Sequence, residues 1–141
     1  MKNTGRIAAA LAVGTMVTGC TTAMTGNDEE QVMAVPVCPT ETRNWTAFVN
    51  AMPGPDARPT LIVQGEALLP ERASVSLTQG PTNRMQPPGQ IMRLSVEPSN
   101  EAAGWHPVRG EAVPGYQSYA YVDVVCGDAV ITRIEDITVA Q

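Results

Sequence analysis

The sequence predicts an all-β fold built as a small antiparallel β-sandwich, with a small β-barrel as the alternative. Short apolar runs alternate with a period of two residues and are rich in β-branched side chains. Proline and glycine separate these runs, and 12 prolines in 141 residues disfavour long helices. No segment carries a long 3.6-residue period, so helix is expected at most as one turn, at residues 101–104.

Six or seven strands are expected, in an arrangement that is immunoglobulin-like in the loose sense. Met92, Leu94 and Val96 alternate clearly as inward positions, with Arg93 and Ser95 facing outward. Gly127 and Asp128 are typical of a two-residue hairpin turn between the last two runs. The expected runs are residues 44–51, 60–69, 74–78, 90–97, 116–126 and 129–139.

The first residues have the layout of a secretory signal. Lys2 and Arg6 supply a positive start, and residues 7–17 form an apolar stretch that is too short to span a bilayer. No later segment approaches 18 consecutive apolar residues, so the sequence offers no second candidate for a membrane segment.

The apolar stretch ends in Val17-Thr18-Gly19-Cys20, which resembles a lipobox, the maturation site of bacterial lipoproteins. The resemblance implies cleavage between Gly19 and Cys20, a diacylglycerol thioether on Cys20 and acylation of the new amine, with palmitate a typical chain. Two or more acyl chains anchor a protein stably. Thr21 follows the cysteine, which by the same resemblance favours the outer membrane, facing the periplasm. An ordinary cleaved signal or an uncleaved anchor is the alternative.

Three regions are expected: a signal peptide at 1–19, the lipidated cysteine with a flexible acidic tether at 20–36, and one β-sandwich domain at 37–141. Two of the nine basic residues lie in 1–19, which leaves seven against 14 acidic residues. A chain this acidic is not expected to bind nucleic acid or anionic lipid head groups, because both require basic side chains.

Cys38 and Cys126 remain after Cys20 is assigned to lipid. An even number of cysteines in an oxidising compartment predicts a disulfide between them. A redox pair and a metal site are the alternatives, although neither cysteine lies in a CxxC motif or near a histidine.

Residues suited to catalysis or metal binding are few, and no cofactor is expected. His106 is the only histidine and is expected in an exposed loop. Glu135 and Asp136 are expected on one strand, where they would point to opposite faces. The methionines are dispersed, so a copper site is disfavoured.

A possible binding surface comprises Trp45, Met52, Tyr119 and Tyr121. The two tyrosines are expected on one face of the 116–126 strand, where an exposed pair could recognise a sugar or a protein. Trp45 is most simply explained as a core residue packed near the disulfide, and the alternative for the tyrosine face is that it covers the second sheet. The proline-rich stretches 52–56 and 85–89 are further candidates for contact, although ordinary turn chemistry explains the same residues.

The segment at residues 45–55 resembles a stretch found in uncharacterised Gram-negative envelope proteins, which implies no activity. The leading hypothesis is a non-enzymatic, lipid-anchored envelope protein that presents its sandwich to a protein or peptidoglycan partner. The alternatives are a periplasmic carrier of a small ligand or metal and, third, a hydrolase. An interior apolar pocket would favour a carrier, whereas His106 near a carboxylate and a hydroxyl would favour a hydrolase.

Overall fold

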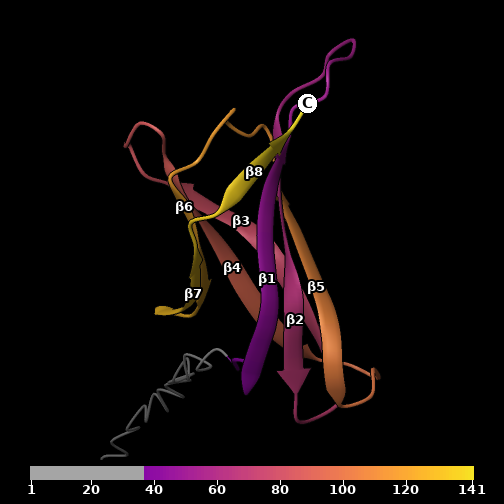
Figure 1. Ribbon diagram of the computed structural model, residues 1–141. Coiled ribbons are helices and arrows are strands. Elements are labelled where there is room, and N and C mark those ends of the chain that lie inside the picture. Colours follow the sequence, from indigo (N-terminus) through magenta and orange to yellow (C-terminus); the bar gives the residue numbers. More distant parts are fainter. Residues whose placement is uncertain (1–36) are drawn as a thin grey trace, which may run out of the picture. The chain divides into compact units, whose positions relative to one another are not determined.

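The computed structural model describes residues 37–141, which form eight strands in two packed sheets (Figure 1). The sandwich prediction is confirmed, and the two sheets do not close into a barrel. The expected signal peptide, Cys20 and the tether lie outside the described residues. The strands are β1 (Glu41–Asn50), β2 (Thr60–Leu69), β3 (Ala73–Thr82), β4 (Gly89–Pro98), β5 (Gly104–Ala112), β6 (Tyr121–Cys126), β7 (Ala129–Ile134) and β8 (Ile137–Ala140).

The two sheets are mixed, which corrects the expectation of an antiparallel sandwich. One sheet has the order β5-β2-β1-β8 and the other β3-β4-β6-β7. β8 runs parallel to β1, and β6 runs parallel to β4. The remaining neighbours are antiparallel. The parallel pairs arise because the chain changes sheet between consecutive strands and returns beside a strand it had left earlier.

Several elements differ from the expected runs, among them β3, which continues to Thr82 and does not end at residue 78. β5 was not expected, since its inward positions carry small residues such as Gly110 and Ala112 and give little hydrophobic signal. The expected 116–126 strand begins only at Tyr121, which leaves Tyr119 in the preceding loop. The last expected run is divided into β7 and β8, and Glu135 and Asp136 lie between these strands and not on one of them.

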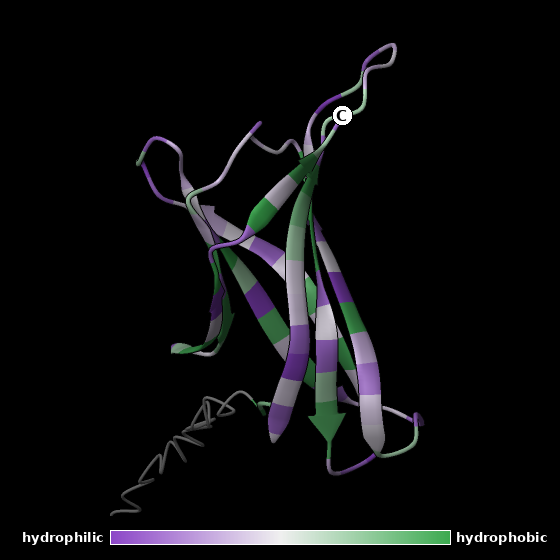
Figure 2. Cartoon of the chain, in the orientation of Figure 1, coloured by the Kyte–Doolittle hydropathy of each residue, from purple (hydrophilic) through white to green (hydrophobic). Residues whose placement is uncertain are grey.

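The core fills the space between the inner faces of the sheets, and apolar and polar residues alternate along the strands in Figure 2. Met92 and Leu94 are buried as the alternation predicts. Gly110 packs so closely that an added Cβ would lie 2.6 Å from the carbonyl oxygen of Leu77. The sheets approach each other here because glycine presents no side chain.

The predicted disulfide joins Cys38 to Cys126, across 88 residues of sequence. It fixes the first described residues to the end of β6, next to the predicted turn at Gly127, whose φ of 60° a glycine adopts without strain. A backbone bond from Thr40 N to Leu68 O adds a second attachment. We call this side of the sandwich the entry end, because the chain enters it at Val37.

The opposite side, the distal end, carries the connections that follow β1, β3 and β5. These are residues 51–59, 83–88 and 113–120. In Figure 1 they lie at the top, whereas the start of β1 lies at the bottom. Within residues 37–141 the structure contains no helix with the length and apolar character needed to cross a bilayer.

Candidate functional site

Three loops at the distal end are linked by backbone hydrogen bonds, and together we call them the distal loop surface (residues 51–59, 83–88 and 113–120). The 113–120 loop connects the other two. Gly115 N donates a hydrogen bond to Pro59 O at 2.7 Å, and Ala120 N donates one to Pro88 O at 2.9 Å. Segments far apart in the sequence are therefore held side by side.

Four large apolar side chains on this surface are exposed to solvent. The exposed fractions are 60% for Met52, 53% for Met85, 53% for Val113 and 47% for Tyr116. Single exposed apolar residues are ordinary, whereas several of them at one end of a domain make that end a candidate interaction site. Methionine and tyrosine are also enriched in protein interfaces.

The 83–88 loop is held by the side chain of Asn83. Its Oδ1 accepts hydrogen bonds from Gly89 N at 2.8 Å and Met85 N at 3.1 Å, and its Nδ2 donates to the hydroxyl of Tyr121 at 2.9 Å. Gly89 is required at this point, because an added Cβ would lie 2.4 Å from the ring of Tyr121. Met85 is thus displayed on a loop that is already in a fixed conformation.

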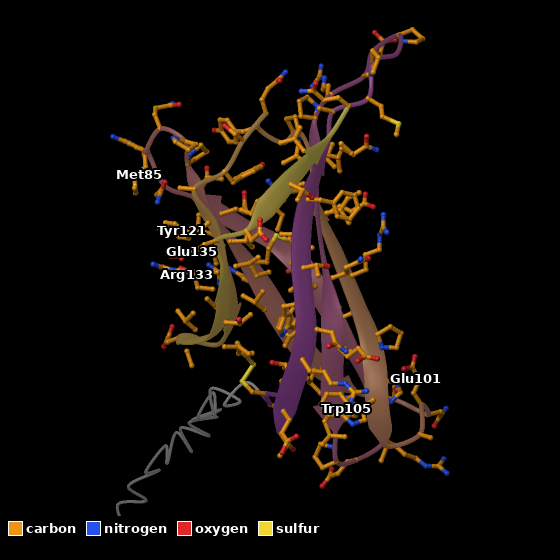
Figure 3. All side chains as sticks on the ribbon, in the orientation of Figure 1. Met85, Glu101, Trp105, Tyr121, Arg133 and Glu135 are labelled. Carbon is orange, nitrogen blue, oxygen red and sulfur yellow. A yellow bond between two sulfur atoms is a disulfide. The ribbon has the colours of Figure 1, made fainter. Side chains whose placement is uncertain are left out.

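Tyr121 is in turn held by β7, and Figure 3 shows it beside Arg133. The guanidinium of Arg133 lies 4.0 Å from the ring centroid of Tyr121. The same guanidinium donates two hydrogen bonds to Asp123, at 2.7 and 2.8 Å. The bond to Asp123 raises the pKa of Arg133 above its ordinary value. Arg133, itself held by Asp123, thus fixes the ring of Tyr121, whose hydroxyl is bonded to Asn83.

The 113–120 loop folds around Tyr119, which is buried. Its hydroxyl accepts a hydrogen bond from Tyr116 N at 2.9 Å, and the two rings meet edge to face with centroids 5.8 Å apart. Gly115 lies against the neighbouring loop, where an added Cβ would approach Pro59 O to 2.8 Å. Tyr116 is therefore held by Tyr119, which is itself part of the core.

Comparison with known protein families, characterised proteins and solved structures finds no match to this chain. The arrangement itself is suited to binding. Loops already held by hydrogen bonds lose little conformational entropy when a partner docks, so more of the interaction energy appears as affinity.

The four residues expected to form a binding surface are not brought together. Met52 lies exposed on the distal loop surface. Tyr119 belongs to the core, and Tyr121 is half-buried under Arg133, so the expected exposed tyrosine pair is wrong. Trp45 packs against the core with its ring over Gly65, which agrees with its interpretation as a core residue. Cys20 and Gly19 lie outside the described residues.

Val113 and Tyr116 were missed by sequence reasoning. Tyr116 was assigned to the expected strand at 116–126. Val113 lies outside every run in which apolar and polar residues alternate. The run Val113-Pro114-Gly115-Tyr116 contained the usable signal, because proline and glycine flanked by apolar residues indicate an exposed turn.

His106 lies on β5, which corrects its expected place in an exposed loop. Its Nε2 is 2.6 Å from Ala102 O and its Nδ1 is 3.3 Å from Glu101 Oε2. Both ring nitrogens thus face acceptors in the bend before β5. Among residues 37–141, no three His, Cys, Asp or Glu side chains gather closely enough to hold a metal ion.

Burial raises the pKa of Tyr119 above its ordinary value of 10.0. The folded state therefore holds this proton more tightly than the unfolded state, and stability is lost as the pH rises above about 10. We expect the free energy of unfolding to fall more steeply above this pH in the wild type than in a Tyr119→Phe variant. Urea titrations at a series of pH values measure this difference. Identical slopes would show that Tyr119 does not contribute.

Proposed function

We propose that this chain is a lipid-anchored envelope protein, without enzymatic activity, that presents the distal loop surface to a protein partner. The observation that carries the proposal is the set of four exposed apolar side chains on three hydrogen-bonded loops. The lipobox-like sequence ending at Cys20 supports anchoring, with the outer membrane as the proposed location and the periplasm as the compartment.

The position of the loops supports display from an anchor. The segment that would follow Cys20 joins the sandwich at Val37, at the entry end, and the loops lie at the opposite end of every strand. A partner could therefore reach the distal loop surface without passing the point at which the chain is attached.

The alternatives find less support. A cavity of about 320 Å³ opens beside Val37 and Cys38 and is lined mainly by the β2–β3 turn and nearby residues. It lies at the entry end, and none of its lining residues belongs to the core cluster between the sheets, where a carrier of the expected kind would hold its ligand. For a hydrolase, His106 faces a carboxylate and a backbone carbonyl, but it bonds to no hydroxyl among the described residues.

Site-directed photo-crosslinking in the native envelope tests the proposal. A photoreactive residue replaces Met52, Met85 or Tyr116, one on each loop. We expect the same crosslinked protein from all three positions. Ser76 and Ser95 are paired neighbours on the outer face of the β3-β4-β6-β7 sheet. They are matched control positions and should give no such product.

Two further variants separate the binding from the anchor. Met52→Asp combined with Met85→Asp should lower the crosslinking yield from Tyr116 about tenfold, because placing a charge in an apolar contact costs about 1.4 kcal/mol or more. Cys20→Ala should move the protein to the soluble fraction. Different products from each position, or none, would refute the loop surface. A Cys20→Ala protein that stays with the membrane would refute the anchor alone.

A further inference from the structure

The outer face of the β5-β2-β1 sheet carries a second feature, a groove of about 440 Å³ that no loop contributes to. It lies toward the entry end, on the same face as Trp105, which Figure 3 labels. Its lining comes from three adjacent strands and consists of Asn44, Thr46, Gln64, Gly65, Glu66, Pro107, Val108 and Arg109. Its volume is within the range of small-molecule sites, about 300–1,000 Å³.

A β-bulge in β1 creates this groove. The pairing with β2 shifts between Arg43 and Thr46, so that two residues of β1 stand opposite Gly65. Asn44 takes up the extra residue with a φ of 56°, a left-handed conformation that asparagine tolerates. The bulge leaves Trp45 in the core and turns Arg43 onto the outer face.

The charges along the groove cancel in pairs. Arg43 bonds Glu66 at 2.7 Å, and Arg109 bonds Glu111 at 2.9 Å. The hydrogen bond from Arg43, followed by that from Asn44, lowers the pKa of Glu66 and keeps this carboxylate ionised. The guanidinium of Arg43 also lies 3.9 Å from the ring centroid of Trp105. The lining of the groove itself holds one carboxylate, that of Glu66, and one guanidinium, that of Arg109, so its formal charges sum to zero and it offers no electrostatic advantage to a charged ligand.

The floor of the groove presents two neutral hydrogen-bonding side chains, Thr46 and Gln64, beside the charged Arg109 and Glu66. Thr46, Gln64 and Arg109 stand in one row across the three strands. The side chains of Thr46 and Gln64 have no hydrogen-bond partner among the described residues. Both hydrogen bonds to the carboxylate of Glu66 are accepted by Oε2. Among the described residues, no group donates to Oε1 of Glu66. The hydroxyl of Thr46 and the amide of Gln64 can both donate to and accept from a bound hydroxyl, and the carboxylate of Glu66 can accept from one.

The backbone beneath the groove is not available to a ligand. β2 is the central strand here, and it pairs with β1 on one side and β5 on the other. An extended peptide usually binds by adding to a free sheet edge, where main-chain groups are unpaired. A ligand on this face must instead be recognised through side chains.

We infer that this groove binds a neutral saccharide chain. Sugar hydroxyls match the open groups of Thr46, Gln64 and Glu66. The apolar face of a sugar ring matches Pro107, which lines the groove. The groove is separate from the distal loop surface, so the inference stands independently of the proposed protein partner.

Calorimetric titration of the purified full chain, in a detergent without a sugar head group, tests the inference. The probes are chitotetraose, cellotetraose and maltotetraose, with tetragalacturonate as the charged comparison and tetra-alanine as the peptide comparison. We expect at least one neutral tetrasaccharide to bind with a dissociation constant of about 1 mM or tighter, and both comparisons to bind more weakly.

Thr46→Val combined with Gln64→Leu removes the open hydrogen-bonding groups with little change in size, and should weaken saccharide binding about tenfold. Ser76→Ala combined with Ser95→Ala is the matched control on the other sheet and should leave the affinity unchanged. Circular dichroism verifies that both variants fold, and Gln64→Leu alone replaces the first variant if it does not. Binding of none of the neutral probes, equal binding of tetragalacturonate or tetra-alanine, or binding that the folded groove variants retain would each overturn the inference.

Discussion

A variant with Cys38→Ser and Cys126→Ser is expected to unfold with a free energy lower by about 4–5 kcal/mol than the wild type. The disulfide closes a loop that spans 88 residues of sequence. In the chain-entropy description, a crosslink across a loop of this length restricts the unfolded chain by about that amount, and strain or residual structure reduces it. For a domain of ordinary stability, about 5–15 kcal/mol, this is a large fraction.

The crosslink has a local consequence as well. Residues 37–40 are held to the sandwich by the disulfide and by the bond from Thr40 N to Leu68 O. Without the disulfide, this segment loses its covalent attachment to β6, so hydrogen exchange should rise there first.

Urea unfolding followed by tryptophan fluorescence, with and without a reducing agent, measures the effect. Reduced wild type and the serine variant should have the same midpoint, and the reducing agent should not alter the variant. A midpoint for the variant equal to that of oxidised wild type would contradict the expectation.

The two tryptophans should differ strongly when each is truncated. Trp45→Ala is expected to destabilise the fold by about 3–5 kcal/mol, the usual cost of removing a large aromatic side chain from a core. Trp45 packs against the buried cluster, and its ring fills the space above Gly65, where even a Cβ would lie 2.5 Å from it.

Trp105→Ala is the matched comparison, with an expected cost of about 0.5–1 kcal/mol. Trp105 is 36% exposed, and its principal contact is the stacked guanidinium of Arg43. Thermal and urea unfolding followed by circular dichroism compares the two variants without relying on tryptophan emission. Equal losses would mean that the inner packing of Trp45 contributes no more than the surface contact of Trp105.

Trp45→Phe adds a finer test. The indole Nε1 of Trp45 is buried and has no hydrogen-bond partner among the described residues. Phenylalanine removes this donor and keeps most of the apolar surface. Its cost should therefore be well below that of alanine, because a buried unpaired polar group is itself unfavourable.

The distal loop surface was only partly predictable. The stretches containing Met52 and Met85 were identified from proline and glycine, whose effect on the backbone is local. Their contact through the 113–120 loop depends on Gly115 meeting Pro59 and on Ala120 meeting Pro88. These pairs are far apart in the sequence, and no periodic pattern indicates them. The expected tyrosine pair failed for a related reason, since Tyr119 precedes β6 and turns into the core.

The groove was not predicted at all. Its formation requires the bulge at Asn44, which reverses the orientation of Arg43 relative to simple alternation. A one-residue irregularity changes which side chains share a face, and alternation read from a single strand cannot reveal it.

The sequence alone determined the all-β class, most strand positions, the hairpin turn at Gly127 and the pairing of Cys38 with Cys126. Each depends on the local period of apolar residues, on local turn chemistry or on a count of cysteines. Tertiary structure alone decided the parallel pairs, the presence of β5 and the residues that each surface brings together. These features depend on which strands meet in space, and the free energy of that choice comes from packing between residues distant in the sequence.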